Sequence, residues 1–173
     1  FQLPVQVAIP NWVPDEDLPE EDGVPLDSNW HGVQMNLLIE LISFYWKDRT
    51  DFYTSGNMFI YYRFIDEAGK ERQQCRGPDF FVVKGCDRHR VRGSWRGWLE
   101  GDHYPNIVVE LISPSTRKTD ENEKFLVYQN LLRTPEYILY YPDEQEIVGW
   151  RLRGGVYMRI PLDARGWLWS EEL

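Results

Sequence analysis

A glutamate stands inside the most apolar run of the chain. Glu110 interrupts Ile107-Val108-Val109 and Leu111-Ile112, a run that predicts a central strand covered on both faces. An ionised carboxylate in such a place costs several kcal/mol unless it is paired or bound to a cation. Glu110 therefore needs a positive partner or a turn toward solvent, and a metal ion and an arginine are both open as partners.

Two other residues could build a site around Glu110. Asp79 opens the preceding apolar strand, Phe80 to Val83, and Lys124 lies on a predicted helix directly after the Glu110 strand. Two carboxylates bind a hard divalent ion, Mg2+ by preference, and such an ion lowers the pKa of its bound water. A lysine beside it orients the attacking water or neutralises developing charge. Taken singly, Asp79 could be a turn residue and Lys124 a solvated helix lysine, but together they indicate metal-assisted phosphodiester hydrolysis.

The elements that would position these residues follow from the apolar periodicity. A helix is expected from the N-cap residues Asp27-Ser28 to Asp48, and a second from Thr119 or Asp120 to Leu132, with Asp120 as its N-cap. The first helix is amphipathic, with apolar residues at three- and four-residue steps: Val33, Leu37, Leu41, Phe44 and Tyr45. Strands are expected at 57–65, 70–75, 80–83, 107–112, 136–141, 146–152 and 156–160. This order predicts an α/β fold in which helices flank a mixed β-sheet with extra β-hairpins.

Charge and composition divide the chain in two. The formal charge is -9, from 19 Lys and Arg against 28 Asp and Glu, but residues 1–46 hold eight of the acids and no Lys or Arg. Residues 1–27, rich in proline and acids, are expected to form an extended arm, and residues 28–173 a single domain. Two cysteines and no apolar run long enough to span a membrane favour a cytoplasmic protein without a disulfide framework or structural zinc.

A basic segment lies near the predicted site. Residues 63–96 hold nine of the 19 bases, with two tryptophans close by. Such a segment can contact phosphates and stack on bases, and it can equally serve as a protein interface. The candidate nucleic-acid contacts are Arg88, Arg90, Arg92 and Arg96.

Several motifs together resemble a known family. Pro78-Asp79 precedes an apolar strand, Val-Val-Glu110-Leu-Ile-Ser-Pro-Ser-Thr is followed by Asp120, Lys124 and Tyr128, and Thr-Pro-Glu-Tyr137 leads into a strand. Over roughly residues 28–160 the chain resembles the Uma-type family of putative restriction endonucleases, in the PD-(D/E)XK nuclease superfamily.

The resemblance implies a restriction endonuclease-like fold, metal binding by Asp79 and Glu110, and Lys124 as the catalytic lysine. The lysine usually found two residues after the acid is replaced by Ile112, which matches the migration of this lysine to the following helix. Accessory roles near the site are open for four residues: His31, Glu40, Asp120 and Tyr128.

The sequence thus predicts an endonuclease that uses Mg2+ or Mn2+ to hydrolyse nucleic acid, DNA in the first place, as a homodimer. Two alternatives stay open. One is a catalytically silent nucleic-acid-binding or regulatory module of the same fold, and the other is a dimeric interaction protein that uses the basic segment and the acidic arm.

Overall fold

The computed structural model describes residues 18–20 and 28–173. The rest of the predicted acidic arm lies outside the described residues. The helical elements are α1 (Asn29–Tyr45), η2 (Gly97–Leu99), η3 (Thr119–Lys124) and α2 (Phe125–Asn130), and none of the described helices is long and apolar enough to cross a membrane. The strands are β1 (Phe52–Ser55), β2 (Ile60–Ile65), β3 (Glu71–Arg76), β4 (Phe80–Lys84), β5 (Trp95–Arg96), β6 (Ile107–Leu111), β7 (Glu136–Tyr141), β8 (Glu146–Arg153) and β9 (Val156–Arg159).

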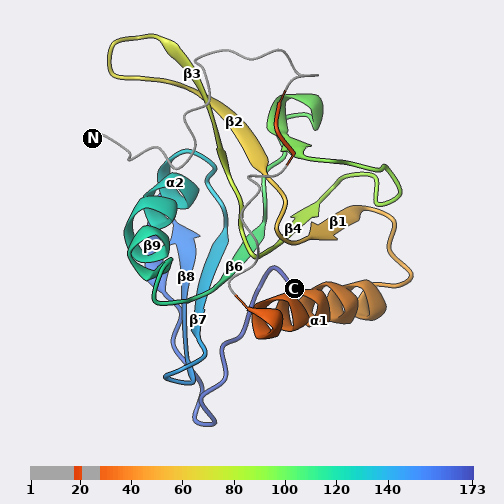
Figure 1. The fold of residues 1–173 in the computed structure, drawn as a ribbon, viewed down its shortest axis with the longest axis vertical. Coiled ribbons are helices and arrows are strands. Elements are labelled where there is room, and N and C mark those ends of the chain that lie inside the picture. Colours follow the sequence, from red (N-terminus) through yellow and green to blue (C-terminus); the bar gives the residue numbers. More distant parts are fainter. Residues whose placement is uncertain (1–17, 21–27) are drawn as a thin grey trace.

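The main sheet has six strands in the order β1-β4-β6-β7-β8-β9 (Figure 1). It is mixed, because β6 runs antiparallel to β4 but parallel to β7. Strand β6 lies inside the sheet and all five of its residues are buried, which confirms the predicted central strand. The chain passes from β6 to β7 through η3 and α2, the connection that parallel neighbours require.

The predicted hairpin of β2 and β3 is present but belongs to a second, three-stranded sheet with β5. Its turn is closed by Asp66, whose Oδ1 accepts hydrogen bonds from the backbone N–H groups of Ala68 and Lys70. Gly69 completes the turn at φ 75°, a conformation that costs glycine little. The short edge strands β1 and β5 escaped the sequence prediction, because segments of four and two residues carry too little alternation to be recognised.

The two faces of the main sheet have separate cores. Alternation turns Phe80 and Val82 toward α1, with Ile107 and Val109 beside them. It turns the intervening residues of β4 and β6 toward α2 and the small sheet, where they join the larger aromatic core. Glu110 belongs by its parity to this second face, so its carboxylate points toward η3 and α2.

Helix α1 begins at the predicted N-cap, where the Ser28 hydroxyl accepts the N–H of His31. The side that packs on the sheet is not the apolar stripe singled out from the sequence. Packing is provided by Leu38, Ile39, Ile42 and Trp46. The stripe defined by Val33, Leu37, Leu41, Phe44 and Tyr45 faces outward, with between 47% and 75% of each residue exposed.

The second predicted helix is present, but its first part, η3, is a π-helical turn. Asp120 does not cap it, contrary to the sequence prediction. The helical segment is already under way at Lys118, so Asp120 lies inside it and its side chain turns to Lys124, four residues on. A buried ion pair fixes η3 to the small sheet: Arg76 Nη2 of β3 lies 2.5 Å from Glu123 Oε1.

Candidate active site

Asp79 and Glu110 lie side by side at the meeting point of β4 and β6. The backbone N–H of Asp79 donates to Glu110 Oε2 at 3.1 Å, and the N–H of Leu111 donates to Asp79 Oδ2 at 2.7 Å. Each carboxylate is therefore held by the strand that carries the other. The antiparallel pairing of β4 and β6 makes this reciprocal arrangement possible.

Lys124 supplies the positive charge that Glu110 requires. Its ammonium lies 3.0 Å from Glu110 Oε2 and 2.8 Å from Asp120 Oδ1, and it donates to the carbonyl of Gly77 at 3.3 Å. The ammonium thus forms ion pairs with two carboxylates and a hydrogen bond with one backbone carbonyl. Burial on its own lowers the pKa of Lys124, but the surrounding carboxylates outweigh it and raise the pKa above its ordinary value.

Glu110 is fully buried, and its pKa is well above the ordinary value for a glutamate. The main cause is loss of solvent; the nearby carboxylates of Asp120 and Asp79 add to the rise, and Lys124 opposes it. Tyr128, one turn beyond Lys124, places its hydroxyl 3.5 Å from Glu110 Oε1. Both oxygens of Glu110 thus face polar groups inside the protein.

Helix α1 brings His31 to the same place. His31 Nε2 lies 2.8 Å from Asp79 Oδ1, and the side chain is buried. The Asp79 backbone is held on its other side by Gly56, where an added Cβ would lie 2.3 Å from the Asp79 carbonyl oxygen. Asn57 next to it donates its N–H to the carbonyl of Pro78. The loop after β1 therefore fixes the position of Asp79.

The predicted residues do not all lie at this site. The structure brings six of them together: Asp79, Glu110, Lys124, His31, Asp120 and Tyr128. Glu40 is exposed on α1, about 13 Å along the helix axis from His31 at a rise of about 1.5 Å per residue.

The four arginines of the basic segment differ in how they are used. Arg88 donates to the carbonyls of Ser43, Trp46 and Arg49 at the end of α1. Arg92 is 3% exposed and pairs with Glu100. The side chain of Arg90 is half exposed, and Arg96 donates to Ser94 Oγ. Nucleic-acid binding by these arginines stays a prediction, and Arg90 is the exposed one of the four.

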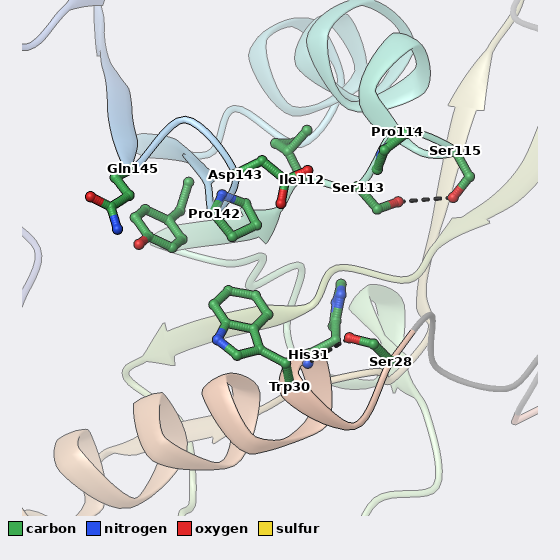
Figure 2. Close-up of a pocket in the computed structure, with 11 residues that line it drawn as sticks. Ser28, Trp30, His31, Ile112, Ser113, Pro114, Ser115, Pro142, Asp143 and Gln145 are labelled. Atoms are coloured by element: carbon green, nitrogen blue, oxygen red, sulfur yellow. Dashed lines mark hydrogen bonds between the residues drawn. The ribbon is translucent and has the colours of Figure 1, made fainter.

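A pocket of about 700 Å3 opens beside His31, between the N-terminus of α1 and the segments that follow β6 and β7. Figure 2 shows Trp30 and His31 on the α1 wall, facing Ile112, Ser113 and Pro142 across the opening. Trp30 was not recognised as a site residue from the sequence. The sequence feature that could have pointed to Trp30 is its place beside His31 in the first turn of the helix.

The donor set suits a hard divalent ion. The carboxylates of Glu110 and Asp120 contact the ammonium of Lys124, and the carboxylate of Asp79 lies beside them at the β4–β6 junction. In the described part of the chain, no group of three or more His, Cys, Asp or Glu side chains is arranged as a metal cage. Mg2+ needs no such cage, because it is commonly held by one or two carboxylates together with waters and phosphate oxygens.

The solved structures include a protein of the same architecture. The crystal structure described as a putative nuclease belonging to DUF820, from Anabaena variabilis ATCC 29413, is 16% identical to this chain, with a TM-score of 0.53. The match covers 79% of this chain and 69% of that one. The fold is thus α/β of the restriction endonuclease-like class.

The sequence then identifies the family. The family model of Uma2, described as "Putative restriction endonuclease", matches residues 22–173, and the chain belongs to this family. The resemblance found from the sequence motifs is confirmed. No curated protein sequence matches the chain.

We expect Lys124→Met to destabilise the fold by about 3–5 kcal/mol, because it leaves Glu110 and Asp120 buried without their cation. The loss should be smaller near about pH 5 than near about pH 8. A carboxyl whose folded pKa is raised contributes stability at low pH that is lost as the pH rises through that pKa, and removing Lys124 raises the pKa of Glu110 further.

Urea unfolding without divalent ions would measure both effects. Lys118→Met is the matched control, since Lys118 is exposed one turn before the site. Equal losses in the two variants would contradict the assignment of Lys124 as the counter-charge.

Proposed function

We propose that this protein is a divalent-metal-dependent endonuclease that hydrolyses phosphodiester bonds of DNA. The observation that carries the proposal is the cluster in which Asp79 and Glu110 lock together at the β4–β6 junction and Lys124 contacts Glu110 directly. Membership of the Uma2 family supports a nuclease.

Asp79 and Glu110 are the residues that would hold Mg2+ or Mn2+. When bound, the ion polarises the phosphate and lowers the pKa of its water. Two further side chains, those of Lys124 and His31, complete the proposed site. Lys124 is held between the carboxylates of Glu110 and Asp120, so it acts as a fixed positive charge rather than as a proton acceptor. His31 positions the Asp79 carboxylate from the side of the pocket.

Metal binding should be visible without any activity. A ligand that binds only the folded state raises its stability, by about 2.7 kcal/mol at one hundred times the dissociation constant. We expect Mn2+ to raise the melting temperature of the wild-type protein and to do so much less in Asp79→Asn. Glu40→Asp, which keeps a carboxylate far from the site, should respond as the wild type does. An equal shift in all three would place the metal elsewhere.

Cleavage should depend on the same residues. We expect the wild type to nick supercoiled plasmid in Mg2+ or Mn2+ but not in EDTA. Glu110→Gln and Lys124→Gln should lower the rate by at least about 100-fold, the usual cost of losing one preorganised electrostatic group.

Lys118→Gln and Glu40→Gln are the matched controls and should cleave at the wild-type rate, with circular dichroism confirming that every variant is folded. If the folded wild type binds metal but cuts neither DNA nor RNA, the catalytic proposal is wrong. The silent nucleic-acid-binding module would then be the better description.

The homodimer is the second part of the proposal, and the exposed α1 stripe supports it. Glu40 is the one Asp, Glu, Lys or Arg residue in α1, and it lies at the edge of the stripe. A two-fold interface brings a surface against its own copy, so a nearly uncharged apolar stripe can pair with itself without like-charge repulsion. Large exposed apolar patches mark interaction sites. We therefore assign the stripe to a second copy of this chain.

Leu41→Glu should convert the dimer to a monomer, because it would put a carboxylate into the apolar stripe of each copy, where the two stripes meet. Light scattering coupled to size-exclusion chromatography would measure the mass. Ile65→Glu, at an exposed isoleucine of β2, is the control and should remain dimeric. A monomeric wild type would contradict the proposal, as would a dimer that survives Leu41→Glu.

A further inference from the structure

The pocket beside His31 has aromatic side walls. Trp30 of α1 and Tyr140 of β7 are nearly parallel, with ring centroids 6.3 Å apart and planes inclined by 23°. Both line the pocket, and 39% of Trp30 is exposed. The two rings stack on each other, and the exposed part of Trp30 is available for a further flat ring.

The two ends of the pocket differ in polarity. At one end are His31, the Ser28 cap and the hydroxyls of Ser113 and Ser115, which lie 2.8 Å apart. The N-terminus of a 17-residue helix adds a partial positive charge there. At the other end is Gln145, on the far side of Trp30 in Figure 2, and Asp143 lies between the two ends, next to Ile112.

This polarity decides which chemical group fits at each end. A phosphate would be repelled by the carboxylate of Asp143 but suits the end at His31, which adjoins Asp79. The eleven residues that line the pocket include no Lys or Arg, so its affinity cannot depend on phosphate charge alone. Aromatic walls with a carboxylate and an amide at the rim suit a nucleobase, which stacks through its face and hydrogen-bonds through its edge.

We propose that this pocket binds one unpaired nucleobase of the nucleic acid, stacked on Trp30, so that the adjoining phosphate lies at the His31 end of the pocket, next to Asp79. This inference rests on the proposed function and names its substrate class: a strand with an unpaired nucleotide beside the bond to be cut. A base within a duplex must leave its stack to enter such a pocket, which favours single-stranded, bulged or mismatched DNA.

Binding measurements can test the base and the ring together. The probes are two fluorescent DNA hairpins, one with a single bulged nucleotide and one with an abasic residue in its place, titrated in Ca2+ and again in EDTA. The wild type should bind the bulged base more tightly, by between about fivefold and 150-fold, the range for one stacked base. Trp30→Ala should lose this preference while binding the abasic hairpin as the wild type does, and Trp30→Phe should keep part of it.

Trp167→Ala is the matched control, because Trp167 is an exposed tryptophan that does not line the pocket. Equal wild-type affinity for the two hairpins would overturn the proposal, and so would binding to neither. If Trp30→Ala lowered the affinity for both hairpins equally, Trp30 would have a structural role, and this outcome would also overturn the proposal. Base-dependent binding without cleavage would contradict the proposed nuclease activity but support the nucleobase pocket. Cleavage without base-dependent binding would support the nuclease activity but contradict the nucleobase pocket.

Discussion

The ion pair between Glu110 and Lys124 is the interaction on which the rest of this structure depends. A carboxylate inside a fully buried strand is expensive, and it is tolerated here because an ammonium from the next element reaches it at 3.0 Å. That ammonium is itself buried and needs further acceptors, which Asp120 and the Gly77 carbonyl supply. The strand, the helical segment after it and the turn before β4 are thus tied through one lysine. These ties gather the carboxylates of Glu110 and Asp120 around one lysine, with Asp79 beside Glu110.

The same point joins the two layers of the fold. Glu110 faces the α2 side of the main sheet, whereas His31 arrives on α1, which covers the opposite face. They meet because Asp79 lies at the end of β4, where the sheet no longer separates the layers. The pocket begins at this opening, with His31 forming part of its wall. The carboxylate cluster and the pocket are therefore neighbours by topology, and α1 reaches the cluster through its first turn while the rest of its length stays available for another contact.

The strands and helices followed from the sequence wherever the apolar pattern was long or the turn residues were explicit, as in β6 and the Asp66 turn. The pairing of Asp79, Glu110 and Lys124 was also within reach, because a buried acid demands a partner and few candidates stood nearby. The side of α1 that packs on the sheet could not be predicted from the sequence. Leu38, Ile39 and Ile42 are as apolar as Val33, Leu37 and Leu41, so the pattern contains two stripes and cannot tell which one meets the sheet. The partners of the arginines could not be predicted either, because Arg88 and Arg92 bind groups that are brought to them only by the fold.

The π-helical turn of η3 places Lys124 so that its ammonium contacts Glu110 of strand β6. A lysine two residues after Glu110 would start from the strand itself, but that place holds Ile112, which is buried in the larger core and donates its N–H to Tyr140. The lysine that contacts Glu110 comes from η3 instead, and Asp120, Lys124 and Tyr128 follow one another at four-residue intervals along η3 and α2. Lys124 and Tyr128 contact Glu110, and Asp120 contacts Lys124. π-Helical turns occur often at functional sites. The wider turn also lets Tyr137 of β7 donate to the Asp120 carbonyl, so the segment is held from the sheet below as well as by its own lysine. The position of the Lys124 ammonium is thus fixed by the fold around it, although the lysine does not lie two residues after the acid in the sequence.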